Sequence, residues 1–261
     1  MSDKITAPKL RAMKQAGQQI VSITAYDSTF GSLADLAGAD FILVGDSVAN
    51  TMLGFESTVP VTLEQMIHHT RAVRAGVKRA LLVADLPFGS YQASIEQAVT
   101  NAVLLMKAGA EAVKLEGSYP ETISALTLAG IPTMGHLGMT PQSIHRFGGH
   151  KVQGRGSGAD RILAAAEELD KAGAIGIVLE LIPTDLAKRV TESVTAPTIG
   201  IGAGPHCSGQ IQVLHDVLGL SPVGFRHAKP FMNGRSLILE ALGEYSRQVR
   251  CGEFPTSEHS F

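Results

Sequence analysis

The sequence is poor in cysteine and has no tryptophan. Cys207 and Cys251 are the only two cysteines in 261 residues, and neither belongs to a CxxC pair or a Cys/His cluster. This argues against a disulfide framework, a structural zinc site and a redox dithiol. We expect two isolated thiols.

An excess of charge and long apolar runs are also lacking. Twenty-two Lys+Arg against 24 Asp+Glu leave a formal net charge of −2, which argues against nucleic-acid and anionic-membrane partners. Charged residues interrupt the sequence often enough that no run of eighteen apolar residues occurs. The N-terminus also lacks an apolar segment of the signal-peptide type. With 44% hydrophobic residues, the chain is expected to be a compact, cytoplasmic protein without membrane contact.

Short β-branched runs alternate with segments of helical period, and no linker divides the chain. The C-terminal ends of the predicted strands are spaced by about 29 residues on average, which is close to the length of one β/α unit. This spacing predicts a single (β/α)8 TIM barrel domain over 1–261. An N-terminal helix is expected around 5–16. The runner-up, an open doubly wound sheet, lacks a GxGxxG segment after the first strand. The eight predicted strands are 20–26, 41–46, 80–85, 112–117, 131–136, 175–180, 197–202 and 223–228.

Four acids end four of these strands: Asp46, Asp85, Glu116 and Glu180. One such acid alone is commonly an N-cap for the next helix. Because strand C-terminal ends meet at one mouth of a β/α barrel, we expect the four carboxylates to converge there.

Alternation within the segment AVKLEG (112–117) separates its apolar and charged side chains. Val113 and Leu115 are expected to face the helices, while Lys114 and Glu116 enter the barrel. Burying these charges is costly unless an ion or an anionic substrate pairs with them.

The types of these residues predict a chemistry. Hard oxygen ligands from Asp46, Asp85 and Glu116 suit Mg²⁺ better than zinc. Apolar neighbours on both sides of Glu180 are expected to raise its pKa and make it a general base. With Lys114 neutralising negative charge, this set is suited to forming the enolate of a 2-oxo acid.

The sequence contains, in this order, the motifs LVGDS (43–47), ADLPFGSY (84–91), VKLEG (113–117), GHLGMTPQS (135–143), FGGHKVQGRG (147–156) and IGIGAG (199–204). Through these motifs the chain resembles the ketopantoate hydroxymethyltransferase family essentially from end to end.

The resemblance implies a (β/α)8 enzyme of pantothenate and coenzyme A biosynthesis. It would transfer a hydroxymethyl group from 5,10-methylenetetrahydrofolate to 3-methyl-2-oxobutanoate, forming 2-dehydropantoate through a Mg²⁺-stabilised enolate. The family pattern assigns Mg²⁺ to Asp46, Asp85 and Glu116, and the oxo acid to Asp46, Ser47, Asp85 and Lys114. It assigns proton abstraction to Glu180, and it implies a homo-oligomer, often a decamer.

Several positions are left open. His136 could position substrate or bond the backbone, while His68 and His69 are expected to serve helix packing and surface. IGIGAG is interpreted as close backbone packing. Departures from the family pattern at Phe55, Ser208 and 225–231 leave folate and subunit contacts unassigned.

Two other functions compete with this one. A magnesium-dependent lyase would use similar acids to cleave a carbon–carbon bond without folate, and a non-catalytic barrel would only bind or assemble.

Overall fold

The computed structural model describes residues 3–222 and 224–261. The chain divides into two compact units, Met1–Val213 and Leu214–Phe261. Among the described residues, no helix has both the length and the apolar character needed to span a bilayer.

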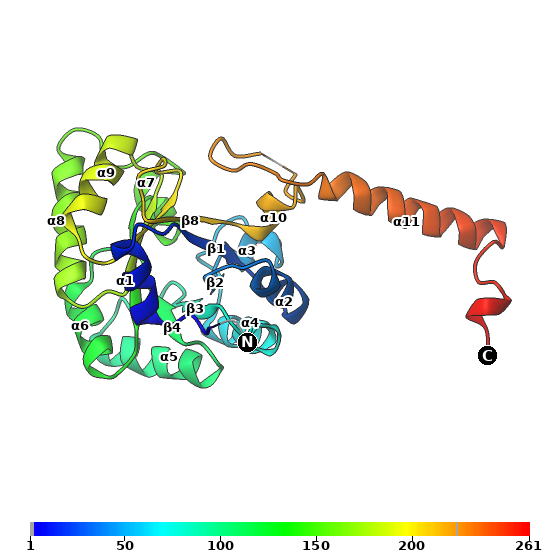
Figure 1. Ribbon diagram of the computed structural model, residues 1–261, viewed down its shortest axis with the longest axis horizontal. Helices are drawn as coiled ribbons and strands as arrows, with labels where there is room; N and C mark the ends of the chain where they lie inside the picture. Colours follow the sequence, from blue (N-terminus) through cyan, green and yellow to red (C-terminus); the bar gives the residue numbers. More distant parts are fainter. Residues whose placement is uncertain (1–2, 223) are drawn as a thin grey trace. The chain divides into compact units, whose positions relative to one another are not determined.

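The first unit is a closed barrel of eight parallel strands in chain order, which confirms the predicted (β/α)8 fold. Figure 1 shows the barrel surrounded by its helices. The strands are β1 (Ile20–Thr24), β2 (Phe41–Val44), β3 (Leu81–Asp85), β4 (Ala112–Lys114), β5 (Thr133–Gly138), β6 (Gly176–Glu180), β7 (Thr198–Ile201) and β8 (Gly209–Gln212).

Helices of the first unit connect most of these strands. Thr62 begins α4 with the predicted capping box, in which its side chain and that of Gln65 bond each other's backbone N–H. Ser94 caps α5 by accepting from Gln97 N, but the Gln97 amide bonds Gly89 O instead of completing a box. The helices are α1 (Ala7–Gln15), α2 (Ser28–Leu36), α3 (Val48–Thr51), α4 (Leu63–Gly76), α5 (Ile95–Lys107), α6 (Pro120–Leu128), α7 (Ile144–Phe147), α8 (Gly158–Lys171) and α9 (Thr184–Ser193), with the 3₁₀ turn η1 (Pro141–Ser143).

Strand alternation divides the hydrophobic core into two clusters. Phe41 and Leu43 of β2 belong to one cluster with inward residues of the other strands, whereas Ile42 and Val44 pack with the helices. Leu10 and Met13 of α1 join the inner cluster, so this helix closes the barrel at the N-terminal ends of the strands. The C-terminal ends are thereby left as the mouth.

The expected eighth strand at 223–228 is wrong. The structure closes the barrel with β8 at Gly209–Gln212, residues 224–228 form no strand, and Val223 lies outside the described residues. The connection from β7 to β8 contains no helix, so the average spacing of a β/α unit placed the last strand too far along the chain. The four-residue β8 also has only one large apolar side chain, Ile211, and gives a weak strand signal.

The second unit begins immediately after the barrel is complete. It contains α10 (Leu214–Val217), α11 (Gly234–Cys251) and the 3₁₀ turn η2 (Ser257–His259). Large apolar side chains of α11 are exposed, including Leu239 at 60% and Leu242 at 58%. The segment therefore adds a helix with an uncovered apolar surface to the eight-stranded barrel.

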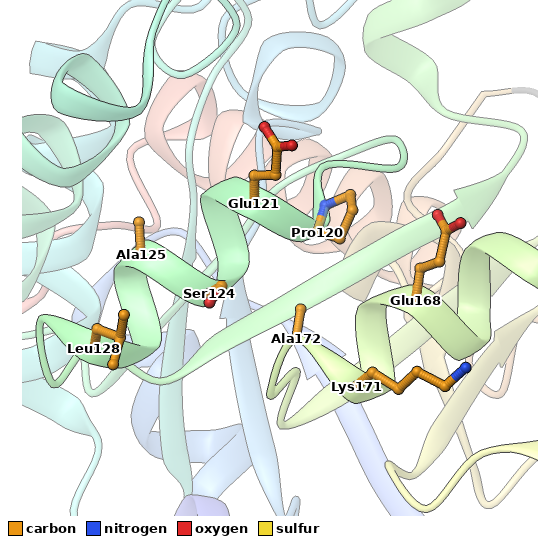
Figure 2. A pocket seen from close by; sticks show the side chains of 8 residues that line it. All are labelled: Pro120, Glu121, Ser124, Ala125, Leu128, Glu168, Lys171 and Ala172. Carbon is orange, nitrogen blue, oxygen red and sulfur yellow. The ribbon is translucent and has the colours of Figure 1, made fainter.

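A shallow groove of about 570 Å³ lies between α6 and α8 on the outer helix layer. Figure 2 shows Glu121 and Leu128 of α6 on one side, and Glu168 and Lys171 of α8 on the other. Leu128 is 87% exposed. None of the acids at the strand ends lines this groove, so it is separate from the barrel mouth.

Candidate active site

The predicted acids and the lysine lie at the C-terminal ends of the barrel strands. Asp85 and Lys114 are opposite each other in the register of β3 and β4, and Asp46 lies just beyond the end of β2. Asp46, Asp85, Lys114 and Glu116 are each at most 4% exposed. As expected from alternation, Val113 and Leu115 pack in the outer cluster while Lys114 and Glu116 point the other way.

An ion pair between β3 and β4 is the centre of this group. Lys114 Nζ lies 2.8 Å from Asp85 Oδ1 and 4.0 Å from Glu116 Oε1. Asp46 N donates to Asp85 Oδ2 at 3.0 Å, which ties the end of β2 to the end of β3. One ammonium group therefore contacts two carboxylates in a region closed to water, where Coulomb interactions are strong.

The pKa directions follow from this crowding. Burial, together with the charges of Asp85 and Glu116, raises the pKa of Asp46 well above its ordinary value. Burial also raises the pKa of Asp85, although Lys114 opposes the shift. Burial lowers the pKa of Lys114, but the surrounding carboxylates outweigh it and raise that pKa overall. Burial and the neighbouring carboxylates thus disfavour the charged form of Asp46, while the same carboxylates favour the charged form of Lys114.

His136 lies between two of the acids. Its Nδ1 is 3.3 Å from Glu116 Oε1, and its Nε2 is 3.4 Å from Glu180 Oε2. Burial and Lys114 lower the pKa of His136, but Glu116 and Glu180 outweigh them and raise it to about 9. His136 O also accepts from Gly117 N at 2.9 Å. The backbone of His136 thus bonds the segment after β4, while its ring faces the acids, where a role in positioning substrate stays a prediction.

Gln142 and Tyr91 also belong to the site, although no pattern in the sequence predicts them. Gln142 Nε2 donates to Asp46 Oδ2 at 2.8 Å, and Gln142 N donates to Glu116 Oε2 at 2.9 Å. Tyr91 OH lies 2.7 Å from Gln142 Oε1 and 3.0 Å from Glu116 O. Glutamine and tyrosine are not residue types that indicate such a site by themselves. Their only sequence signal is that Tyr91 lies in the motif ADLPFGSY and Gln142 in GHLGMTPQS.

Ser47 follows Asp46 and opens α3. Its Oγ is 2.8 Å from Tyr26 OH, which in turn accepts from Thr24 Oγ1 at 2.9 Å. Burial raises the pKa of Tyr26, so the phenol is neutral and can donate a hydrogen bond. The predicted substrate residue Ser47 is thus beside the acid cluster and held by residues from the end of β1.

Glu180 has a mixed environment. Of its apolar sequence neighbours, Ile177 and Leu179 point outward to the helices, but Val178 faces the barrel interior on the same side as Glu180. The side chain of Glu180 is 14% exposed, and its Oε2 lies 3.4 Å from His136 Nε2. The apolar neighbourhood expected from the sequence is therefore present in part, and the role of Glu180 as base stays a prediction.

Leu181, directly after Glu180, is strained. It is the only described non-glycine residue with positive φ, at 46°, a conformation that costs of order 1 kcal/mol or more for a branched side chain. Two hydrogen bonds hold it, from Leu181 N to Ile201 O and from Gln153 N to Leu181 O, each 2.9 Å long. This turn fixes the end of β6 where the Glu180 carboxylate projects.

The oxygen donors at the mouth suit a hard divalent cation by their chemistry. Within residues 3–222 and 224–261, no group of three His, Cys, Asp or Glu side chains is arranged so that it could hold a metal ion as it stands. The backbone N of Asp46 donates to Asp85 Oδ2, and burial together with the charges of Asp85 and Glu116 raises the pKa of Asp46. A cation beside these carboxylates would favour their charged forms. The assignment of Mg²⁺ to Asp46, Asp85 and Glu116 stays a prediction.

The other open positions have structural explanations. His68 is exposed on α4, and His69 Nδ1 lies 2.7 Å from Tyr26 O. A Cβ on Gly204 would come within 2.5 Å of Thr184 Oγ1, which confirms close packing in the IGIGAG segment. Ser208 exchanges hydrogen bonds with Thr198 and is part of the β7–β8 join.

Comparison with known proteins agrees with this geometry. The family model described as ketopantoate hydroxymethyltransferase matches residues 4–257. A relative from Cyanothece sp. (strain PCC 7425 / ATCC 29141), named 3-methyl-2-oxobutanoate hydroxymethyltransferase, is 51% identical over 97% of this chain and 99% of its own. One of the same name from Thermotoga maritima is 50% identical over 97% of this chain and 95% of its own.

Solved structures resemble the fold at low identity. A phosphonopyruvate hydrolase aligns with TM-score 0.62 and 15% identity over 97% of this chain and 93% of its own. A phosphoenolpyruvate phosphomutase from Streptomyces platensis subsp. rosaceus aligns with TM-score 0.64 and 14% identity over 95% and 88%. At such identities the likeness concerns the barrel alone.

Proposed function

Because this chain belongs to the ketopantoate hydroxymethyltransferase family and is an enzyme of that hydroxymethyltransferase class, we propose that its one-carbon donor is 5,10-methylenetetrahydrofolate. The acceptor is 3-methyl-2-oxobutanoate, and with one water the products are 2-dehydropantoate and tetrahydrofolate. This reaction would serve pantothenate and coenzyme A biosynthesis. The observation that supports the proposal most strongly is the convergence of Asp46, Asp85, Lys114, Glu116 and Glu180 at one mouth.

Glu180 is the proposed proton acceptor. Its carboxylate projects at the end of β6 and is accessible, while the neighbouring carboxylates are more deeply buried. It takes the proton from carbon 3 of the oxo acid, and the carbanion so formed attacks the one-carbon unit of the donor. The imidazolium of His136, 3.4 Å from Glu180 Oε2, holds that carboxylate in place.

Lys114, Asp46, Ser47 and Asp85 form the proposed oxo-acid site. The Lys114 ammonium supplies positive charge for the substrate carboxylate, and the Ser47 hydroxyl supplies a neutral hydrogen bond. Asp46, Asp85 and Glu116 would hold Mg²⁺, whose chemistry when bound is to polarise the keto group of the oxo acid. A bound cation would also reduce the repulsion between these buried carboxylates and the anionic substrate.

A coupled assay tests the proposal. The full chain is supplied with the oxo acid, methylenetetrahydrofolate and Mg²⁺, and each component is omitted in turn. We expect 2-dehydropantoate only when all three are present. Carbon–carbon cleavage of an acid without folate would instead support a lyase, and the absence of any turnover would contradict the catalytic assignment.

Gln142→Leu is expected to weaken the site without changing any of its charges. The substitution removes the bonds of the Gln142 side chain to Asp46, Leu86 and Tyr91, so Asp46 Oδ2 loses its amide donor while Tyr91 keeps its bonds to the backbone of Glu116. Loss of a side chain that orients ligands typically costs about 10- to 100-fold in metal affinity or activity. The Kd for Mg²⁺ with the oxo acid present, measured by calorimetry, checks this.

Gln97→Leu is the matched control for Gln142→Leu. Gln97 lies in the first turn of α5, and its side-chain amide donates to Gly89 O in the preceding loop rather than to an acid of the site. Equal cation affinity in Gln142→Leu and wild type would contradict the positioning role.

We also propose that the chain forms a homo-oligomer, a decamer by family resemblance. The support is the exposed apolar surface of α11, where Leu239, Leu242 and Tyr245 are each more than half exposed. Replacing Leu239 and Leu242 with serine is expected to lower the mass measured by light scattering. Replacing the lone exposed Leu128 of α6 is the control. An unchanged mass in the α11 variant would contradict this use of the helix.

A further inference from the structure

Among the loops that follow β1 to β7 at the barrel mouth, only one carries lysine or arginine. The loops after β1 to β4, β6 and β7 contain no Lys or Arg, but they do contain acids such as Asp27 and Glu56. The loop from β5 to α8, residues 139–157, contains Arg146, Lys151 and Arg155 and no acid. We call this segment the basic loop.

The three cations of the basic loop lack an anionic partner. Across residues 3–222 and 224–261, no ion pair joins Arg146, Lys151 or Arg155 to an acid. The guanidinium of Arg146 instead lies 6.0 Å from the centre of the Phe147 ring. The loop thus presents uncompensated positive charge.

Contacts place the basic loop beside the proposed base. Near its start, Gln142 bonds Asp46 and Glu116 inside the site. Later, Gln153 N donates to the carbonyl of Leu181, the residue after Glu180. Lys151 and Arg155 are exposed and are each two residues from Gln153, so the chain carries both cations close to the end of β6.

The chemistry of the donor matches this placement, an inference that rests on the proposed function. For carbon transfer, the pterin end of methylenetetrahydrofolate must enter the mouth to reach carbon 3 of the oxo acid beside Glu180. The opposite end of a folate carries glutamate carboxylates, one more for each γ-linked glutamate added, and stays outside. Acidic rim loops would repel this tail, whereas Lys and Arg bind carboxylates well.

We propose that the basic loop, through Lys151 and Arg155, binds the glutamate tail of the folate and makes the enzyme selective for donors with several glutamates. The loop then has two roles. Gln142, near its start, donates hydrogen bonds to Asp46 and Glu116, and the cations farther along bind the co-substrate.

The experiment compares tetrahydrofolate carrying one glutamate with tetrahydrofolate carrying four. Calorimetry on the full chain with the oxo acid present gives the Kd of each. We expect wild type to bind the longer form about tenfold more tightly, as two exposed ion pairs allow, and salt to reduce this preference. The double variant Lys151→Gln, Arg155→Gln should bind both forms equally.

Lys107→Gln is the matched control, because Lys107 lies at the C-terminal end of α5, at the other end of the barrel. It should keep the wild-type preference, and the KM for the oxo acid should be unchanged in all variants. Equal binding of the two folates by wild type, or a preference retained in the double variant, would overturn the inference. Folate binding without hydroxymethyl transfer would contradict the proposed function alone.

Discussion

Replacing Glu180 with glutamine is expected to abolish proton exchange at carbon 3 of 3-methyl-2-oxobutanoate in D₂O. Glutamine keeps the shape of the side chain but cannot accept the proton. General-base catalysis typically contributes about 10²- to 10⁴-fold, so the exchange rate should fall by that amount. Loss of the methine signal from the NMR spectrum, followed with Mg²⁺ and enzyme present and no folate, measures the rate.

The control for this prediction is Glu168→Gln on the outer surface of α8, which should exchange at the wild-type rate (Figure 2). A second variant, His136→Gln, distinguishes loss of the proton acceptor from loss of the residue that positions it. Glutamine at 136 leaves Glu180 able to accept a proton but removes the cation that holds its carboxylate in place. We expect slow but measurable exchange there. Wild-type exchange in Glu180→Gln would remove the base assignment altogether.

The barrel is predictable from the sequence because most of its strands carry their own local signal. The AVKLEG segment shows this best, since alternation alone predicts that Lys114 and Glu116 point inward, as they do. The same rule separates the apolar neighbours of Glu180, because Ile177 and Leu179 point to the helices while Val178 points into the barrel on the side of Glu180. The acid at the strand end can be predicted, but its environment depends on β5, which brings His136 alongside.

Residues outside the strands are harder to predict. Gln142 lies in a 3₁₀ turn and bonds acids that are 96 and 26 residues away, so no local pattern reveals it. The prediction of the last strand fails for a related reason. β8 is specified by pairing with β1 and β7, and its own sequence, Gly-Gln-Ile-Gln, has little β-propensity. Non-local contacts, invisible in periodicity, decide both features.

Asp85→Asn is expected to have the second large effect, because Asp85 joins the proposed metal site to Lys114. The substitution keeps the side-chain volume but removes the charge 2.8 Å from Lys114 Nζ and weakens the acceptor for Asp46 N. Metal polarisation contributes several kcal/mol, so turnover should fall on the order of a thousandfold. Calorimetry should also show no uptake of Mg²⁺ with the oxo acid.

If Asp85 served only to stabilise the fold, its loss would change stability but not Mg²⁺ binding. A second substitution at Lys114 separates these two roles. In Asp85→Asn the lysine loses its nearest buried partner, which lowers stability. The double variant Asp85→Asn, Lys114→Met removes the stranded charge, so its melting temperature should recover while Mg²⁺ uptake stays absent. Asp160→Asn, an exposed acid on α8, is the control and should change neither. If Asp85→Asn bound Mg²⁺ as tightly as wild type, Asp85 would not be a metal ligand. Its role would then be limited to the ion pair with Lys114.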